Sequence, residues 1–323
     1  MSLEKEMDLG QAAVRVAIQI CQGLRSGLSP ADTLTKSDAS PVTVADFAAQ
    51  AAINTCLHRA FPSDPIVGEE DSADLRAPGG AELLDRISRA IQPFFPELDA
   101  EAIIEAIDRG GHGGGPEGRF WTLDPIDGTK GYIRGEQYAI ALALIENGEV
   151  QLGVLGCPAM LASDGTVGCM FAAARGQGSR ATPLQGEAQA IRVQDLDGFE
   201  RANFCESVET GHSAHGASKD IAERLGITAP PLRIDSQCKY AAVARGEATL
   251  YLRLPRDDRY REKIWDHAAG VILVEEAGGR VSDVNGKPLD FSRGQQLEDN
   301  RGVIVSNGAL HERVLSVVGE VLS

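Results

Sequence analysis

The sequence lacks several features that mark other classes of protein. Its apolar runs, such as residues 138–145, are far too short to cross a bilayer. Its six cysteines are scattered without a CxxC pair, which argues against a zinc site and against a small disulfide-stabilised scaffold. Basic residues are in the minority, 31 against 47 acidic ones. The formal charge of −16 therefore disfavours binding to nucleic acid, because most of the surface would repel phosphates.

The N-terminus carries neither an apolar signal core nor an Arg/Ser-rich transit pattern. Together with the scattered cysteines, this favours a reducing, cytoplasmic location, with a chloroplast or a mitochondrion after removal of a transit peptide as the alternative. We expect a small-molecule partner, no nucleic acid and no membrane, and either a monomer or a homodimer.

The composition is that of an ordinary globular protein, with 43% apolar and 24% charged residues. A chain of 323 residues is long enough for about two domains. We place the boundary near Asp197-Gly198, which gives an N-terminal α+β domain over 1–197 and a C-terminal α/β domain over 198–323.

Apolar spacing and turn residues predict the elements. Thr43 is expected to cap a helix, with Asp46 as the acidic member of a capping box. Asn147-Gly148 and residues 163–165 are expected to form hairpin turns. The predicted helices cover 3–24, 44–59, 81–95 and 98–107, and the predicted strands cover 65–68, 120–123 and parts of 138–174.

The densest chemistry lies in residues 121–131. A strand delivers Asp124 at its end, Pro125 is expected to stop further pairing, and Gly128 permits a tight turn. Asp127 returns close to Asp124, so that the two carboxylates can share a hard cation such as Mg²⁺.

The free N–H groups of Gly128 and Thr129 are suited to a phosphate oxygen. Taken alone, the segment is equally typical of an Asx-rich turn that caps a helix. Residues 111–116 are also rich in glycine, but they lack the Lys-Ser/Thr that follows in a phosphate-binding loop, and we interpret them as a connection.

Three other acidic residues have similar alternatives. Glu69 lies in an acidic turn after an apolar strand, where it is either a site residue or a solvated charge. Asp266 precedes a helix that ends near residues 276–279, a position that the helix dipole favours. Asp46 is explained equally well as a cap.

In combination, these segments resemble a known family. Residues 68–71, 124–129 and 265–270 together are similar to the signature set of the inositol monophosphatase superfamily of metal-dependent, lithium-sensitive phosphatases. Further segments resemble the 3'(2'),5'-bisphosphate nucleotidases, closest to their eukaryotic, plant-type branch, and the likeness runs essentially from end to end. These segments are residues 36–46, 126–138, 211–215, 235–240 and 251–255.

The resemblance implies an α/β fold, an αβαβα sandwich of alternating helix and sheet layers. It implies a Mg²⁺-dependent phosphatase that converts adenosine 3',5'-bisphosphate to AMP and phosphate, and that also acts on 3'-phosphoadenylyl sulfate in sulfur metabolism. Asp46 and Thr129 would orient or deprotonate the attacking water. Two or three Mg²⁺ ions would be held by Glu69, Asp124, Asp127, Asp266 and the main-chain carbonyl of Ile126.

The second phosphate of such a substrate needs cationic donors, and arginine can bind it with two parallel hydrogen bonds. By the resemblance, His212, Ser236, Lys239 and Arg253 contact the nucleotide, in addition to the phosphate contacts expected from the N–H groups of Gly128 and Thr129. The alternatives are a polar surface turn for His212 and ordinary salt bridges for Lys239 and Arg253.

Cys157 and Cys169 lie at equal distances from Ser163 and would face each other in a symmetric hairpin. We consider them a candidate redox pair whose disulfide damps activity, the alternative being two small buried side chains.

Two other functions remain open at this point. An inositol 1,4-bisphosphate 1-phosphatase shares the metal motifs, but Lys239, Arg253 and residues 211–215 favour a nucleotide. A nucleotide-binding redox sensor would need neither the acidic residues nor Thr129.

Overall fold

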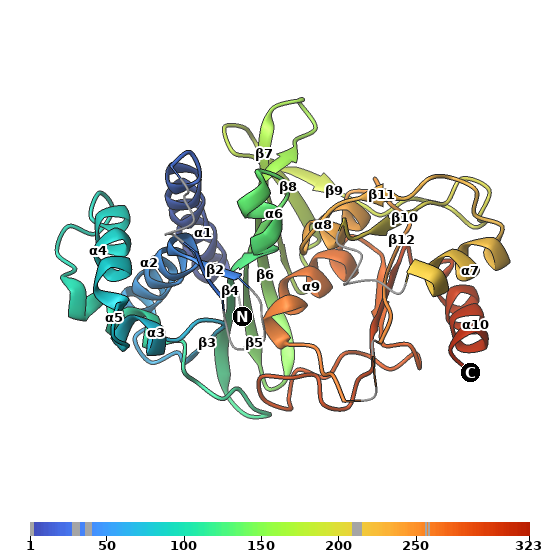
Figure 1. Cartoon of the computed structure of the whole chain (residues 1–323). Coiled ribbons are helices and arrows are strands. Elements are labelled where there is room, and N and C mark those ends of the chain that lie inside the picture. Colours follow the sequence, from blue (N-terminus) through green and yellow to red (C-terminus); the bar gives the residue numbers. More distant parts are fainter. Residues whose placement is uncertain (1–2, 28–32, 36–40, 209–214, 256, 258) are drawn as a thin grey trace.

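The computed structural model describes residues 3–27, 33–35, 41–208, 215–255, 257 and 259–323. Its described elements stack as alternating layers of helices and sheets (Figure 1). The described helices are α1 (Glu4–Arg25), α2 (Val44–Ala60), α3 (Ala73–Arg76), α4 (Gly80–Ile91), α5 (Ala100–Asp108), α6 (Thr129–Arg134), α7 (His215–Leu225), α8 (Cys238–Ala244), the 3₁₀ helix η3 (Ile264–Asp266), α9 (Ala268–Glu276) and α10 (His311–Leu322).

The described strands form a small pair, β1-β2, and two larger sheets, ordered β3-β4-β5-β6-β7-β8-β9 and β11-β10-β12-β14-β13. The strands are β1 (Thr33–Thr35), β2 (Pro41–Thr43), β3 (Ile66–Gly68), β4 (Arg119–Asp127), β5 (Ala139–Glu146), β6 (Glu149–Leu161), β7 (Val167–Ala174), β8 (Ser179–Pro183), β9 (Gln189–Ile191), β10 (Phe204–Glu206), β11 (Leu232–Arg233), β12 (Leu250–Arg253), β13 (Arg280–Ser282) and β14 (Val303–Ser306).

The two faces of the seven-stranded sheet are buried against different helices. On β5, the large side chains of Ile140, Leu142 and Leu144 pack on the side of α1 and α2. Alternate positions are small, Ala141 and Ala143 among them, and they join a core with α8 and α9. This alternation follows from the period of two along a strand.

Helices α8 and α9 form the middle layer, because their core includes residues of both sheets. Helices α7 and α10 cover the outer face of the five-stranded sheet through a separate apolar cluster. The expected αβαβα sandwich is therefore confirmed. Among the described residues, no helix has both the length and the apolar character needed to cross a bilayer.

Two glycines let α9 lie close to its neighbours. A Cβ on Gly153 of β6 would come within 2.8 Å of the Ala269 carbonyl oxygen. A Cβ on Gly270 would come within 2.3 Å of the Tyr240 ring on α8. Since α9 follows η3 directly, this packing also fixes the depth at which Asp266 lies.

Most of the predicted helices and turns are confirmed. The capping box of α2 is present, with the Thr43 N–H donating to Asp46 Oδ2 at 2.8 Å. Asn147 and Gly148 both have positive φ, 52° and 79°, as a tight hairpin turn requires. Helix α4, in contrast, ends at Ile91 rather than at residue 95, because Pro93 has no N–H with which to continue the helical hydrogen bonds.

The prediction that Pro125 ends the pairing of its strand is wrong. Strand β4 continues to Asp127, and its register with β5 shifts by one residue between Asp124 and Asp127. Such a bulge accommodates an extra residue on one strand. Proline is tolerated at position 125 because β3 pairs with β4 only as far as Leu123. On the side of β4 that faces β3, no N–H is therefore needed after Leu123.

The seven-stranded sheet uses strands between residues 66 and 191, and the five-stranded sheet uses strands between residues 204 and 306. The division into domains at 197 and 198 stays a prediction. Residues 111–118 form a loop between α5 and β4, as expected of a connection.

Candidate active site

The predicted site residues come from elements that are far apart in the sequence and meet between the sheets. The positions are the first turn of α2 (Asp46), the turn after β3 (Glu69), the bulged end of β4 (Asp124, Ile126, Asp127), the start of α6 (Gly128, Thr129), the approach to α8 (Ser236), the first turn of α8 (Lys239), the end of β12 (Arg253) and η3 (Asp266). His212 lies outside the described residues.

Glu69, Asp124, Asp127 and Asp266 form one group, here called the carboxylate cluster. Asp124 is only 2% exposed. Burial raises its pKa well above the usual range, and the negative charges of the other three acids add to this shift. Burial also raises the pKa values of Asp127 and Asp266, and nearby cations only partly oppose it. The cluster therefore holds negative charge at a high free-energy cost.

The carboxylate cluster fits a hard divalent cation. All its side-chain donors are oxygens, which is the chemistry that Mg²⁺ prefers. Asp124 uses Oδ1 to accept the Ile126 N–H at 3.1 Å, which orients the carboxylate across the bulge. The same bulge places the Ile126 carbonyl 3.2 Å from the Thr129 hydroxyl, beside the acids. A cation would relieve the repulsion that the backbone imposes here.

Asp46 and Thr129 form a directed pair. Oδ2 of Asp46 accepts hydrogen bonds from the Thr43 N–H at 2.8 Å and the Thr43 hydroxyl at 2.6 Å. Oδ1 lies 3.3 Å from the Thr129 hydroxyl. The cap therefore occupies one carboxylate oxygen and leaves the other facing Thr129. The cap is confirmed, and the catalytic role of Asp46 stays a prediction.

Gly128 is needed for the turn into α6. Its φ is 89°, in the left-handed region that glycine adopts most readily. A Cβ there would also lie 3.0 Å from the Cβ of Ser236. Ser236 itself has a positive φ of 64°, and its hydroxyl donates to the Asp235 carbonyl at 2.5 Å. These two backbones therefore approach closely where α6 meets the start of α8.

Gln237 joins the two halves of the site, and the sequence motifs did not single it out. Its N–H donates to Asp127 Oδ2 at 2.6 Å. Its side chain donates to the Trp265 carbonyl at 2.9 Å and accepts from the Gly270 N–H at 3.2 Å. The only sequence signal was its position beside Ser236, in a segment already expected to bind substrate.

Lys239 and Arg253 both lie close enough to Asp127 to oppose the rise in its pKa. Lys239 is buried, with its ammonium 5.2 Å from the centre of the Tyr251 ring. Burial lowers the pKa of Lys239, and the charge of Asp127 opposes that change. The structure thus brings both predicted cations to the carboxylate cluster.

Arg253 is held by a buried polar chain. Its guanidinium pairs with Glu262 at 2.7 Å and lies 3.5 Å from Asp266. Glu262 lies 3.3 Å from Nε2 of His267, whose Nδ1 lies 2.7 Å from the Tyr240 hydroxyl. Burial alone would raise the pKa of Glu262, but the charges and hydrogen bonds of Arg253 and His267 together outweigh it and bring the value to about 2.

Glu262, Asp266 and His267 also lie close enough together to suggest a metal site, with candidate ligand atoms within 4.8 Å of one another. Their existing contacts argue against this. Glu262 is already neutralised by Arg253, and His267 uses both ring nitrogens in the polar chain. We therefore assign Glu262 and His267 to the support of Arg253.

The register pairs Cys157 with Cys169, although not through a symmetric hairpin. Leu161 pairs with Val167, and the register shifts between this pair and the cysteines, so that a bulge in β6 brings the thiols opposite each other. Both are free and buried. Burial raises both pKa values, that of Cys169 to about 11, which slows thiolate chemistry. The disulfide stays a prediction.

Comparison with known sequences identifies the family of the chain. The model of the inositol monophosphatase family matches residues 3–323. A Schizosaccharomyces pombe protein named 3'(2'),5'-bisphosphate nucleotidase is 44% identical over 100% of this chain and 97% of its own length. A protein of the same name from Oryza sativa is 44% identical over 98% of this chain and 94% of its own length.

Solved structures show a similar fold. The Thermotoga maritima IMPase superposes with a TM-score of 0.68 at 24% identity, covering 98% of both chains. The inositol monophosphatase from Anabaena gives a TM-score of 0.66 at 21% identity, covering 99% of this chain and 97% of that one. These likenesses concern the fold alone.

The repulsion within the carboxylate cluster predicts a gain in stability when one charge is removed. We expect Asp124→Asn to raise the melting temperature of the metal-free protein by about 2–4 °C, since a domain of this size gains roughly that much per kcal/mol. The amide oxygen can still accept the Ile126 N–H.

The measurement is thermal unfolding at pH 7 in the presence of a chelator. Asp220→Asn, on the exposed face of α7, removes the same formal charge outside the cluster. It should change the melting temperature by about 1 °C at most. A fall in the melting temperature of Asp124→Asn would contradict the electrostatic account.

Proposed function

The chain belongs to the inositol monophosphatase family, and we propose that it hydrolyses the 3'-phosphate of adenosine 3',5'-bisphosphate to give AMP and phosphate. The structural observation that carries this proposal is the Thr129 hydroxyl, which lies between Asp46 and the Ile126 carbonyl beside the buried carboxylate cluster. The names of the relatives supply the substrate class.

We propose that Mg²⁺ is the cation and that two or three ions bind. The carboxylate cluster and the Ile126 carbonyl would hold them, and Li⁺ would compete for one position. When bound, the ions would lower the pKa of water and stabilise negative charge on the phosphate.

The chain's own contribution is to orient the water and to accept its proton. The Thr129 hydroxyl has one hydrogen, which it can donate to Asp46 at 3.3 Å while its lone pairs accept from water. Asp46 is held rigidly by its capping box, so it can receive the proton through Thr129 without moving. Fixing the water in this way removes part of the entropy cost of the attack.

We propose that Lys239 binds the second phosphate of the nucleotide. It is buried on the side of Asp127 and contacts an aromatic ring, whereas Arg253 is already paired with two carboxylates. Arg253 and Ser236 would complete the nucleotide subsite, with the N–H groups of Gly128 and Thr129 on the scissile phosphate, and His212 is proposed as a further contact.

The related substrate 3'-phosphoadenylyl sulfate carries a 3'-phosphate of the same kind, and we include it in the proposal. The free state of all six cysteines supports the proposal of a reducing compartment, such as the cytoplasm. Whether the chain is a monomer or a homodimer can be measured directly by light scattering.

The first test is phosphate release from adenosine 3',5'-bisphosphate with Mg²⁺. We expect turnover that is lost with a chelator and reduced by millimolar Li⁺. Inositol 1,4-bisphosphate at the same concentration is the matched comparison, and it should be a poorer substrate by at least about tenfold in kcat/KM, or roughly 1.4 kcal/mol. Preference for the inositol would overturn the substrate assignment.

The second test removes the hydroxyl that links water to Asp46. Thr129→Val keeps the side-chain shape but has no donor to Asp46, and we expect kcat to fall by about 10²-fold or more, with KM changed little. Thr129→Ser retains the hydroxyl and is the control, with kcat expected within about tenfold of the parent. Equal losses in the two variants would count against the proton path.

The third test concerns the second phosphate. Lys239→Met keeps the apolar stem and removes the charge, so kcat/KM for adenosine 3',5'-bisphosphate should fall by about 10-fold to 100-fold. The value for 3'-AMP, which has no 5'-phosphate, should change much less. Lys219→Met, at an exposed position on α7, controls for net charge. An equal loss for both substrates would place Lys239 outside the 5'-phosphate subsite.

A further inference from the structure

Gln50 is a fully buried polar side chain with no role in the chemistry proposed so far. It lies on α2, one turn after Asp46, so that both residues project from the same side of the helix. Its amide bonds both halves of the Glu70 main chain. Nε2 donates to the Glu70 carbonyl at 2.5 Å, and Oε1 accepts the Glu70 N–H at 3.0 Å.

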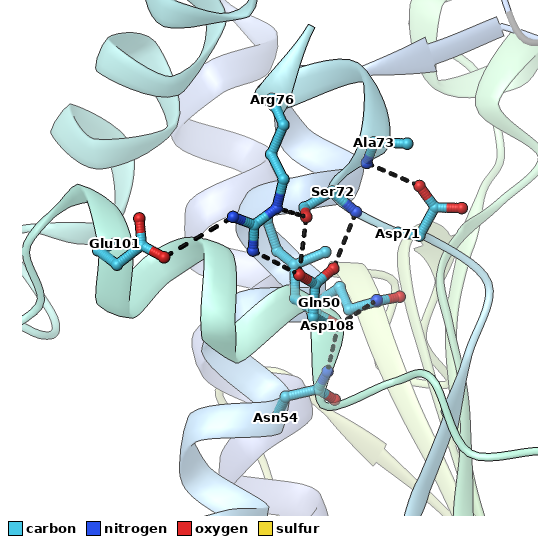
Figure 2. Close-up of polar contacts among 9 residues, drawn as sticks. Gln50, Asn54, Asp71, Ser72, Ala73, Arg76, Glu101 and Asp108 are labelled. Atoms are coloured by element: carbon cyan, nitrogen blue, oxygen red, sulfur yellow. Dashed lines mark hydrogen bonds and ion pairs between the residues drawn. The ribbon is translucent and has the colours of Figure 1, made fainter.

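The same amide also reaches the end of α5, where Nε2 donates to the Ile107 carbonyl at 3.1 Å (Figure 2). Gln50 therefore joins three segments: its own helix, the acidic turn after β3 and the last turn of α5. These three contacts are all with main-chain groups, so they hold backbone position rather than a particular side chain.

Two glycines make room for this amide. A Cβ on Gly68 would lie 2.7 Å from Oε1 of Gln50, and a Cβ on Gly110 would lie 2.9 Å from Nε2. The two glycines also bond each other, since the Gly68 N–H donates to the Gly110 carbonyl at 2.8 Å. The backbone at Gly68 and the backbone at Gly110 thus both approach the Gln50 amide more closely than a residue with a Cβ could.

A second group of contacts holds the far side of the acidic turn (Figure 2). Asp108 accepts the Ser72 N–H at 3.0 Å and the Ser72 hydroxyl at 2.8 Å. Arg76 donates to Asp108 at 2.9 Å and to the Ser72 hydroxyl at 2.9 Å. These contacts are partly exposed, so we expect them to restrain the turn less firmly than the buried amide does.

Glu69 directly precedes the residue that Gln50 holds. Its N–H donates to the Leu123 carbonyl at 3.1 Å, next to Asp124 on β4, and Gln50 holds the following residue. The carboxylate of Glu69 lies close enough to Asp124 for its charge to raise the pKa of that acid. The peptide that follows Glu69 is thus tied to the helix that carries Asp46.

We propose that Gln50 is a positioning residue for Glu69: it fixes the turn after β3 against α2, so that the Glu69 carboxylate enters the carboxylate cluster in register with Asp46. The inference rests on the proposed function, in which Glu69 holds a divalent cation. Without the Gln50 amide, the Glu69 carboxylate would still be present but would no longer be held in position. The cation would therefore bind more weakly.

The chain offers a matched control. Asn54 lies one turn further along α2, is equally buried, and donates to the Ala106 carbonyl at 2.9 Å and the Ile107 carbonyl at 3.4 Å. Figure 2 shows both amides directed at the same end of α5. Asn54→Leu therefore removes a comparable buried amide from the same helix without touching the contacts to Glu70.

The experiment measures binding of Mn²⁺ to the full-length, metal-free protein by electron paramagnetic resonance. Gln50→Leu should raise the Kd for Mn²⁺ by about 10-fold to 100-fold, the usual cost of losing a residue that orients a metal ligand. The Kd of Asn54→Leu for Mn²⁺ should stay within about threefold of the parent value, because this variant keeps the hydrogen bonds to Glu70. The Mg²⁺ concentration for half-maximal phosphate release should rise in parallel for Gln50→Leu, with kcat at saturating Mg²⁺ largely kept.

Gln50→Glu provides a second variant should the leucine variant fail to fold. Its carboxyl can still accept the Glu70 N–H but cannot donate to two carbonyls at once, so we expect a Kd between those of the parent and Gln50→Leu. Parental Mn²⁺ affinity in the Gln50 variants, or an equal loss in Asn54→Leu, would overturn the proposal. A parent that binds Mn²⁺ but releases no phosphate from adenosine 3',5'-bisphosphate would defeat the proposed function alone and leave the positioning of Glu69 standing.

Discussion

Repulsion among closely spaced acids, of which Asp124 is buried and the others half-buried, is the constraint on which the rest of this site depends. The carboxylate cluster would disperse into water if its members were free to move, since burial and neighbouring charge both raise the pKa of Asp124. Each acid is instead delivered by a backbone feature that its own side chain cannot easily displace. These features are a bulged strand for Asp124 and Asp127, a clamped turn for Glu69, and a 3₁₀ turn packed under α9 for Asp266.

The junction between the two sheets holds the cluster largely without neutralising it. Asp127 is bonded by a main-chain N–H, that of Gln237, which fixes its direction and contributes no full charge. Away from the cluster the junction uses an ion pair, between Arg134 on α6 and Asp235 before α8. Lys239 and Arg253 offset only part of the negative charge of the cluster, so the cluster keeps its attraction for a cation.

Local sequence patterns predicted the elements and most acidic positions, because caps, turns and apolar periods act over a few residues. Asp46 illustrates this, since its capping box could be inferred from Thr43 three residues earlier. Pro125 shows the limit. Whether a proline ends a strand depends on which neighbour requires its N–H, and that is a property of sheet order rather than of the segment.

Contacts over long sequence distances could not be predicted in the same way. Gln50 reaches Glu70 and Ile107, and Gln237 reaches Asp127, across 20 to 110 residues. A buried amide carries no signature of its partner, because any main-chain donor or acceptor satisfies it. Even the opposed cysteines were predicted from a symmetric hairpin, whereas a bulge in β6 brings Cys157 opposite Cys169.

The charges at the site differ from the charge of the protein as a whole, which explains how a protein with a formal charge of −16 can bind a polyanion. Lys239 is buried and Arg253 is half-buried beside Asp127, where a lowered dielectric strengthens their interaction with any phosphate that enters. Glu262 keeps Arg253 charged and fixed, and His267 and Tyr240 complete the buried chain behind Glu262. A cation at the carboxylate cluster would add further positive charge to the site. The acidic surface thus sets the net charge of the protein, while a few buried residues set the sign of the field at the site.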